Sequence, residues 1–215
     1  MERAVFLDRD GVLNAMVYNS EFGTVDSPAS PDEFELLPGA AEAVRRVNEL
    51  CLLAVVVSNQ PGVAKGRFTL PLLEATTRKL RQALAAAEAR LDAVYYCLHH
   101  PRALLPQYRV ACDCRKPKPG MLLKAARELN LDLGRSYLIG DGITDLCAGR
   151  AAGATTVFVN DRKCYYCEEL ARQGARPDYW VAGLAEAVAV IEQLEAAPVA
   201  VPHPDLVRLA SSIGV

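Results

Sequence analysis

The sequence predicts an α/β protein in which helices cover both faces of a central parallel β-sheet. Short apolar runs, each long enough for one buried strand, alternate along the 215 residues with stretches of helical periodicity. Polar or acidic residues follow three of these runs, as expected where parallel strands end at one edge of a sheet. Apolar residues make up 51% of the chain, which is enough for the sizeable core that such a fold needs.

Five apolar runs are predicted to form the strands of this sheet. The first leads into Asp8-Arg9-Asp10-Gly11, which taken alone is equally compatible with an ordinary Asp-Gly turn. The second ends at Ser58 and Asn59, the third enters a loop rich in Cys and His, and the fourth ends at Asp141. The fifth is rich in β-branched residues, which favour strands. The predicted strands span residues 4–7, 52–57, 93–97, 136–141 and 155–159.

The predicted helices lie between and after these strands. In the first of them Val44, Val47 and Leu50 recur at helical spacing, with charged residues between them. Thr69 and Pro71 resemble a helix start. The predicted helices span residues 40–50, 69–90, 121–129, 143–152 and 183–195.

Two segments lack a periodic apolar pattern. Residues 15–38 are polar and rich in Pro, Ser, Asp and Glu, so we expect a long loop or a small flap over the end of the first strand. Residues 196–215 are rich in Pro and Val and are predicted to form a tail without catalytic duty. The length predicts a single domain, which we place at residues 1–195.

Composition and charge argue against several functional classes. The net charge of −2 gives no electrostatic case for binding nucleic acid or an anionic membrane. Asp8 and Asp10 interrupt the first apolar run, so we expect no signal peptide, and no stretch is long enough to span a bilayer. We expect a cytoplasmic, monomeric protein whose seven cysteines serve as thiols or metal ligands rather than in disulfides.

An acidic cluster is predicted at the carboxyl edge of the sheet. It would bring together the side chains of Asp8, Asp10, Asp141 and Asp145. Like charges raise one another's pKa, and a hard divalent cation such as Mg²⁺ relieves the repulsion. Lys116, the Ser58 hydroxyl and the Asn59 amide complete a set of groups suited to phosphoryl transfer. The chain has no Walker P-loop and no GxGxxG pattern, so the use of ATP or NAD has no support.

A second group of potential ligands follows the third strand. Cys97-x-His99 and Cys112-x-Cys114 supply three sulfurs and one imidazole, the donor set of a closed structural Zn²⁺ site. Such an ion would pin the loop at residues 97–114, which has little core of its own. Free thiols with a surface histidine are the alternative, and His100 is a second candidate for the imidazole ligand.

Four motifs in order resemble those of the haloacid-dehalogenase (HAD) superfamily phosphatases. They are Asp8-Arg9-Asp10-Gly11, Ser58, Lys116, and Gly140-Asp141 through Asp145. Any single motif is weak, but the four together are specific, and the resemblance covers about residues 4–195. It implies a three-layer Rossmann-like fold with a parallel sheet, in which the small flap and the zinc-binding loop stand in place of a large cap.

The resemblance assigns catalytic roles. Asp8 would be the nucleophile that forms an aspartyl-phosphate, and Asp10 the general acid/base that protonates the leaving oxygen and later deprotonates water. The Asp8 side chain, the Asp10 backbone carbonyl and Asp141 would hold Mg²⁺. Ser58 and Lys116 would bind the transferring phosphoryl group. Asp145 would support the metal's outer shell or orient Lys116.

The zinc-binding loop resembles that of one subfamily in particular. Tyr95-Tyr96-Cys97-x-His99-His100-Pro101 and Cys112-x-Cys114-Arg115-Lys116-Pro117-x-Pro119-Gly120-Met121 are similar to the D,D-heptose 1,7-bisphosphate phosphatases. Histidinol-phosphate phosphatases share the loop and the catalytic motifs, and the Pro-Gly-Met continuation favours the heptose enzymes. The implied reaction is Mg²⁺-dependent hydrolysis of the 7-phosphate of D-glycero-D-manno-heptose 1,7-bisphosphate; histidinol phosphate or another small sugar or polyol phosphate is the alternative.

The same resemblance implies substrate-binding residues. Arg115 would contact the substrate, and Asn59 and Gln60 are also predicted to bind it. Lys65 would meet the distal phosphate unless it is a solvated loop lysine. Two features depart from the subfamily: the flap is longer, which puts the substrate in question, and Gly142 stands where lysine is common.

Other functional classes use similar residues. Phospho-signalling receiver domains also combine acids, a hydroxyl and a lysine, but they lack an acid/base group two residues beyond the phosphorylated aspartate, which Asp10 supplies here. A non-catalytic zinc-stabilised binding protein would not need an intact acidic cluster. Cys164 and Cys167 form a Cys-x-x-Cys that is compatible with plain thiols, a redox pair or a second metal.

Overall fold

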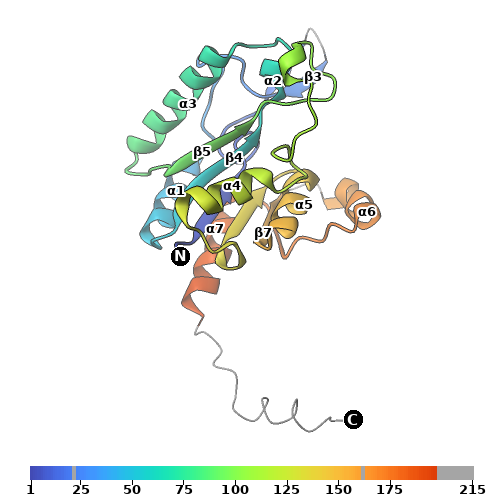
Figure 1. Cartoon of the computed structure of the whole chain (residues 1–215). Coiled ribbons are helices and arrows are strands. Elements are labelled where there is room, and N and C mark those ends of the chain that lie inside the picture. The colour runs from blue at the N-terminus through green and yellow to red at the C-terminus, as the bar shows by residue number, and fades with distance from the viewer. Residues whose placement is uncertain (21–22, 161–162, 198–215) are drawn as a thin grey trace, which may run out of the picture.

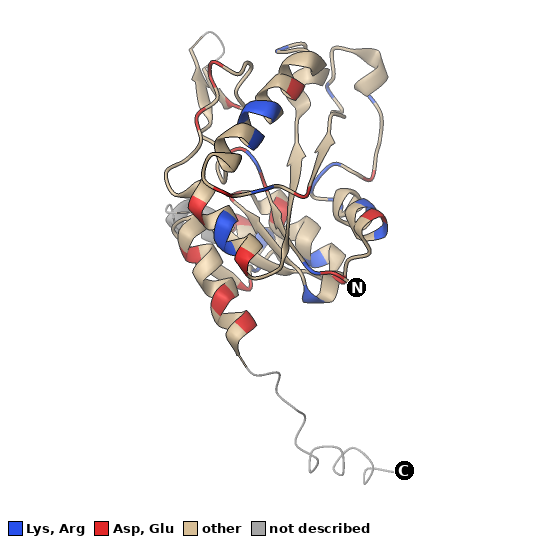
Figure 2. Ribbon diagram, turned by 90° about the vertical axis from the view of Figure 1, so that its left-hand side faces the viewer, with Lys and Arg blue, Asp and Glu red and all other residues tan. Residues whose placement is uncertain are grey.

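A six-stranded parallel sheet forms the centre of the molecule, with strand order β5-β4-β1-β6-β7-β8 (Figure 1). The computed structural model describes residues 1–20, 23–160 and 163–197. The strands are β1 (Ala4–Leu7), β4 (Leu53–Asn59), β5 (Ala93–Cys97), β6 (Tyr137–Gly140), β7 (Thr155–Val159) and β8 (Tyr179–Val181). None of these strands contains a charged residue, whereas charged residues of both signs are spread over the helices (Figure 2).

Helices cover both faces of the sheet, and this makes three layers (Figure 1). One face packs against α1 (Ala40–Glu49), α3 (Leu70–Ala85) and α7 (Leu184–Ala196). The other packs against α4 (Gly120–Leu129), α5 (Ile143–Ala152) and α6 (Lys163–Gln173). Alternate residues of each strand enter opposite cores, as the period-2 pleat requires: in β1 Val5 and Leu7 face the first group, and Phe6 faces the second.

The five predicted strands and the α/β class are confirmed, with differences at the ends of elements. β4 continues through Ser58 and Asn59, and α3 ends at Ala85 rather than at residue 90. The sequence did not predict β8, α6 or the single-turn helix α2 (Pro61–Ala64). Short 3₁₀ turns lie at Pro106–Tyr108 and Leu133–Arg135.

The flap at residues 15–38 is more ordered than a plain loop. It contains an antiparallel hairpin of β2 (Val17–Asn19) and β3 (Thr24–Asp26). Three-residue strands are too short to produce a recognisable alternation in the sequence, so the hairpin could not be predicted. An ion pair between Asp26 and Arg67 ties the hairpin to the segment that follows α2.

The order of the strands creates a crevice beside β1. The chain runs outward from β1 to β4 and β5, then returns to β6 on the other side of β1 and continues to β7 and β8. At the carboxyl ends of β1 and β6, Leu7 is paired with Ile139 and the Asp8 amide donates to the Ile139 carbonyl at 2.9 Å. The strand order reverses direction at this position, which is called a topological switch point, and ligands of open α/β sheets bind there. The topology alone therefore predicts a ligand-binding site at this edge of the sheet.

None of the helices described in residues 1–20, 23–160 and 163–197 is both long enough and apolar enough to cross a bilayer. Most of the predicted C-terminal tail, residues 198–215, lies outside the described residues. So do the side chains of Cys164 and Cys167, although α6 includes both positions.

Candidate active site

Three carboxylates meet at the switch point. Asp8 follows β1, Asp141 follows β6, and Asp145 lies in the first turn of α5. One carboxylate oxygen from each lies within 4.8 Å of the others. The turn after Asp8 is folded tightly over Asp141: Gly11 has φ +82°, and a Cβ at Gly11 would lie 2.2 Å from Asp141 Oδ2. Only glycine suits this position, which explains the Asp-Gly pair in the first motif.

Lys116 lies against this cluster and is almost fully buried. Its Nζ lies 3.0 Å from Asp8 Oδ1, contacts Asp145 Oδ1, and donates to the Val57 carbonyl at 2.8 Å. Burial alone would lower the pKa of Lys116, but the carboxylates of Asp145 and Asp8 outweigh burial and hold the pKa above its ordinary value. Lys116 is therefore a fixed positive charge beside Asp8.

Asn59 fixes the backbone of Lys116. The Lys116 amide donates to Asn59 Oδ1 at 3.1 Å, and Asn59 Nδ2 donates to the Lys116 carbonyl at 3.1 Å. The sequence predicted Asn59 as a substrate-binding residue, whereas in the structure both ends of its amide are bound to the protein. Its observed contacts orient the lysine.

The positive charge of Lys116 does not fully offset the repulsion among the three carboxylates. Burial, together with the nearby Asp8 and Asp145, raises the pKa of Asp141 to about 7. Burial and Asp8 raise the pKa of Asp145 to about 6, although Lys116 opposes the shift. The single ammonium of Lys116 faces the carboxylates of Asp8, Asp141 and Asp145. Carboxylate oxygens are hard ligands. The residues present therefore fit a hard divalent cation such as Mg²⁺.

The Asp10 side chain was predicted to join this cluster, but its carboxylate is not among the three whose oxygens lie within 4.8 Å of one another, because other side chains hold it. It accepts hydrogen bonds from Arg9 Nη2 at 2.9 Å, Asn14 Nδ2 at 2.9 Å, Ser27 Oγ at 2.8 Å and Gln60 Nε2 at 2.6 Å. Burial would raise the pKa of Asp10, but Arg9 and these hydrogen bonds outweigh it and hold the pKa below its ordinary value. In this conformation Asp10 is a well-ordered anion.

Arg9 and Gln60 form the inner wall of the Asp10 site, and both are fully buried. Arg9 Nη2 donates to Gln60 Oε1 at 3.1 Å, and its guanidinium lies 5.6 Å from the centre of the Tyr96 ring. Gln60 Nε2 also lies 3.2 Å from Ser58 Oγ. The structure thus places Gln60, predicted to bind substrate, inside the network around Asp10 rather than on a pocket wall, and places the buried Ser58 hydroxyl next to it.

A cavity of about 970 Å³ lies between the flap and α2, and Ser27 lines it beside Asp10. Lys65 and Arg102 line the same cavity. Burial and the positive charges of Arg102 and Arg115 lower the pKa of Lys65. Among the described residues, no ion pair joins Lys65, Arg102 or Arg115 to a carboxylate. A cation cluster without acidic partners is suited to binding an anion.

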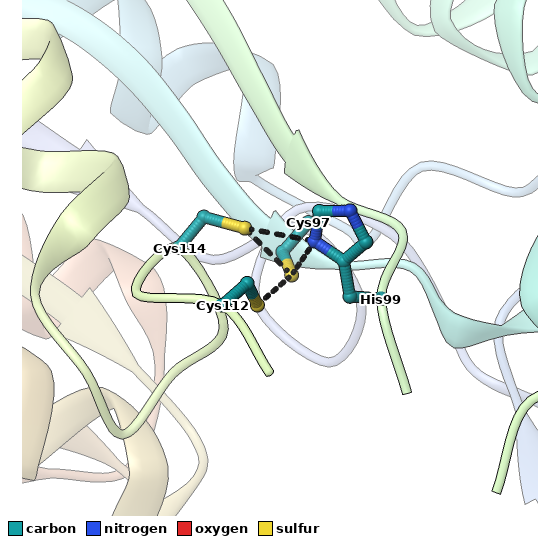
Figure 3. Close-up of side chains that lie close together, drawn as sticks. All are labelled: Cys97, His99, Cys112 and Cys114. Carbon is teal, nitrogen blue, oxygen red and sulfur yellow. Dashed lines mark hydrogen bonds between the residues drawn. The ribbon is translucent and has the colours of Figure 1, made fainter. Parts of the chain in front are cut away.

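Four side chains converge at the end of β5 (Figure 3). Cys97 Sγ lies 3.1 Å from Cys114 Sγ and 3.7 Å from Cys112 Sγ, and His99 Nδ1 lies 3.3 Å from Cys114 Sγ. Burial and the neighbouring Cys114 raise the pKa of the Cys97 thiol. Three sulfurs and one imidazole around a common centre fit Zn²⁺. His100 lies outside this group, and its Nδ1 accepts the Arg102 amide at 3.0 Å.

Four residues of these sites were not singled out from the sequence. Arg9 belongs to the first motif and Asn14 follows it by three residues, but the sequence pattern does not show which groups their side chains contact. Ser27 reaches Asp10 because the flap folds back over β1, and Arg102 lines the same cavity as Lys65 because the loop at residues 97–114 docks on α2. That docking is made by the amides of residues 104 and 105, which donate to the Ala64 carbonyl at 2.8 and 3.1 Å.

Comparison with known proteins supports one family. A model of the HAD-hydrolase-like family matches residues 113–187. A curated D-glycero-beta-D-manno-heptose-1,7-bisphosphate 7-phosphatase from Escherichia coli is 40% identical over 153 residues, which cover 71% of this chain and 76% of that protein. The enzyme of the same name from Yersinia pestis is 39% identical over 161 residues, covering 74% and 81%.

Solved structures agree with these relatives. The D,D-heptose 1,7-bisphosphate phosphatase from B. bronchiseptica, in complex with magnesium and phosphate, superposes with a TM-score of 0.72 at 31% identity, covering 89% of this chain and 99% of that one. The corresponding enzyme from Burkholderia thailandensis gives a TM-score of 0.61 at 27% identity, with coverage of 89% and 99%. The resemblance found in the motifs is thereby confirmed, and the chain belongs to the D-glycero-β-D-manno-heptose-1,7-bisphosphate 7-phosphatase family of HAD-like hydrolases.

Proposed function

We propose that this protein is a Mg²⁺-dependent phosphoric monoester hydrolase that removes the 7-phosphate of D-glycero-D-manno-heptose 1,7-bisphosphate through an aspartyl-phosphate. The observation that carries the proposal is the position of Asp8 at the switch point, 3.0 Å from the buried ammonium of Lys116 and beside Asp141 and Asp145. The activity of the relatives supports the same conclusion.

Asp8 and Asp10 divide the chemistry between two steps. In the first, a carboxylate oxygen of Asp8 bonds to phosphorus, the bond from phosphorus to the sugar oxygen breaks, and Asp10 gives its proton to that oxygen. In the second, water bonds to phosphorus, Asp10 takes the proton from the water, and the Asp8 carboxylate is released with inorganic phosphate. A carboxyl group that changes roles in this way acts as general acid and then as general base.

Other residues hold the phosphoryl group and the cation. Lys116 and Ser58 are proposed to bind the phosphoryl oxygens, with Asn59 keeping Lys116 in place. The Asp8 side chain, the Asp10 backbone carbonyl and Asp141 would hold Mg²⁺, with Asp145 behind them. When bound, Mg²⁺ neutralises the charge of the phosphoryl group and of the carboxylates.

Four further parts of the proposal concern the rest of the molecule. A structural Zn²⁺ is proposed at Cys97, His99, Cys112 and Cys114, whose ligand atoms converge. The catalytic domain is proposed to span residues 1–195. We also propose that the protein is a cytoplasmic monomer, and that it acts on a small phosphorylated sugar without a nucleic-acid or membrane partner.

A panel of phosphate esters tests the substrate. With Mg²⁺ present, kcat/KM should be highest for heptose 1,7-bisphosphate and lower for histidinol phosphate and for sugar monophosphates. The product should retain the anomeric phosphate, which ³¹P NMR distinguishes from a primary phosphate. Faster turnover of histidinol phosphate, or release of the anomeric phosphate, would contradict the assignment.

Removal of Lys65 or Arg102 should affect only substrates with two phosphates. We propose that these cations and Arg115 bind the phosphate that is not transferred. Lys65→Ala and Arg102→Ala should each lower kcat/KM for the bisphosphate by about 10- to 100-fold, the value of one lost charge-assisted hydrogen bond to an anion. The turnover of p-nitrophenyl phosphate should not change.

Lys118→Ala is the matched control for these variants. It removes a positive charge that is paired with Asp113 at 2.9 Å and does not line the cavity. It should not change either activity. Equal losses for the bisphosphate and for p-nitrophenyl phosphate in Lys65→Ala and Arg102→Ala would show that these residues do not bind a second phosphate.

The affinity for Mg²⁺ should fall as the pH decreases. Burial, Asp8 and Asp145 raise the pKa of Asp141 to about 7 in the metal-free protein. Below this pH a proton occupies the ligand oxygen and must be displaced, so the affinity should decrease by up to about tenfold per pH unit. Above it the affinity should be constant. Calorimetric Mg²⁺ titrations at pH 6, 7 and 8 measure this, and an equal affinity at pH 6 and pH 8 would contradict it.

A further inference from the structure

The flap is bonded directly to the carboxylate that we assign as the acid/base. Ser27 follows β3 immediately, and its Oγ donates to Asp10 Oδ2 at 2.8 Å. It also lines the cavity between the flap and α2. Asp26, the residue before Ser27, forms an ion pair with Arg67. This ion pair holds the flap near Ser27 against the wall of the cavity. The orientation of Asp10 therefore depends on where the flap lies.

Its place in the chain distinguishes Ser27 from the other partners of Asp10. Asp10 Oδ1 accepts from Arg9 and Asn14, and Oδ2 accepts from Gln60 and Ser27, with a longer contact to Arg9 at 3.2 Å. Arg9 and Asn14 come after β1 and before the flap, and Gln60 directly follows β4. Ser27 is the one of these four partners that lies in the flap at residues 15–38, so its hydrogen bond is the one that depends on the position of the flap.

The proposed reaction needs the Asp10 carboxyl to face the leaving oxygen in the first step and the attacking water in the second. The hydrogen bond from Ser27 Oγ holds Oδ2 from the side of the flap, whereas Arg9, Asn14 and Gln60 hold the carboxyl from outside the flap. Loss of the bond from Ser27 would allow the carboxyl to turn and would lower the fraction of molecules in which it faces the reacting oxygens.

We propose that Ser27 is a positioning residue that couples the flap to Asp10 and fixes the orientation of its carboxyl group. The inference rests on the proposed function, because it presumes that Asp10 is the acid/base. Ser27 acts through Asp10 and does not itself bond to the phosphoryl group.

Ser27→Ala should lower kcat for heptose 1,7-bisphosphate by about 10- to 100-fold. A general acid/base contributes about 10²- to 10⁴-fold to the rate, and a misoriented Asp10 would lose part of this contribution. KM should remain within about twofold, because no substrate contact is removed. A sugar oxygen needs a proton to leave, whereas p-nitrophenolate does not. The pre-steady-state burst of p-nitrophenol from p-nitrophenyl phosphate should therefore keep the wild-type rate. Ser27→Thr retains a hydroxyl and should restore most of kcat.

Ser30→Ala is the matched control. It removes a hydroxyl from the same flap that accepts the Glu33 amide at 3.4 Å and has no bond to Asp10. It should have wild-type kinetics, and a thermal melt of each variant shows that the fold is retained. An unchanged kcat in Ser27→Ala, a change confined to KM, an equally slowed burst, or a failure of Ser27→Thr to restore kcat would overturn the inference.

The outcome can be separated from that of the proposed function. If Asp10→Asn retains the wild-type kcat for the sugar bisphosphate, the assignment of Asp10 fails and the role of Ser27 falls with it. If Asp10→Asn is slow but Ser27→Ala is not, only the role of Ser27 is overturned.

Discussion

Asp8→Asn is expected to lower kcat by at least about 10³-fold for every phosphate ester, since removal of a covalent nucleophile costs this much or more in other enzymes. An amide oxygen is a poor nucleophile and cannot form the aspartyl-phosphate. Two nearby acids of the described residues are held by other groups, since Asp145 is buried against Lys116 and Asp10 is bound to Arg9. Steady-state kinetics give kcat, and acid quenching with labelled substrate shows whether a phosphoenzyme forms.

The same substitution should leave the fold intact or stabilise it slightly. Asp8 is one cause of the raised pKa values of Asp141 and Asp145, so its removal relieves repulsion in the metal-free protein. Lys116 keeps Asp145 as a partner. A melting temperature equal to or above that of the wild type, with the activity lost, separates a catalytic role from a structural one.

Asp32→Asn is a suitable control because Asp32 is an exposed acid of the flap. It should retain wild-type activity. Turnover above about 1% of wild type in Asp8→Asn, with Asp32→Asn unaffected, would exclude Asp8 as the nucleophile.

The main part of the fold could be predicted because its strands are buried on both faces. Such strands are continuous apolar runs, as Ala4-Val5-Phe6-Leu7 is, and they stand out from helical periodicity without any tertiary information. Once the strands are parallel, their carboxyl ends share an edge, so Asp8 and Asp141 were expected to meet. Their carboxylate oxygens do lie within 4.8 Å of each other, and Asp145 joins them from the first turn of α5, which follows β6.

Two of the missed elements, α2 and β8, are short. β8 has three residues of intermediate exposure, too few to show an alternation. The Ala-rich sequence after Ala85 favours a helix, and this is why the helix was predicted to reach residue 90. The chain leaves the helix there instead, with Glu88 at φ +58°, and Ala89 and Leu91 turn back into the core. Burial at these two positions outweighs the local propensity.

Side-chain orientation explains the remaining differences at the site. Ser58 and Gln60 are two residues apart in an extended chain and point to the same side, while Asn59 points to the other. Gln60 therefore joins Ser58 and Asp10, and Asn59 holds Lys116. The sequence motif indicated that these residues belong to the site, but it did not indicate which groups their side chains contact. The orientation of Gln60 depends on Arg9, whose buried positive charge attracts the side-chain oxygen of Gln60.

Cys112→Ala is expected to abolish zinc binding and to lower the melting temperature by at least about 6 °C, which corresponds to about 3 kcal/mol for a chain of this size. A structural Zn²⁺ contributes on the order of 10 kcal/mol to ordering its segment, which is comparable to the stability of a whole domain. The loop has little apolar packing to replace this contribution: Leu104 is 70% exposed and Val110 is 46% exposed.

Elemental analysis of the wild type should find about one zinc per chain, as the single set of four ligands among the described residues requires. Cys51→Ala is the matched control, because Cys51 is an exposed thiol outside the cluster. It should keep both the zinc and the melting temperature. A folded wild type that contains no zinc, or a Cys112→Ala variant that retains it, would contradict the site.

The loss of zinc should also reduce catalysis before the protein unfolds. Cys114 is followed directly by Arg115 and Lys116, and Cys97 is paired in the sheet with Asn59, the residue that holds the Lys116 backbone. A zinc ion held by these residues would therefore fix the backbone just before Lys116 through Cys114, and the strand position of Asn59 through Cys97. A displacement of about 1 Å at such a group costs about 10²-fold in rate. Cys112→Ala should thus lower kcat for p-nitrophenyl phosphate about 100-fold at temperatures where circular dichroism shows a folded protein. A variant that has lost its zinc and is folded, but retains wild-type kcat, would show that the loop stabilises the fold without positioning Lys116.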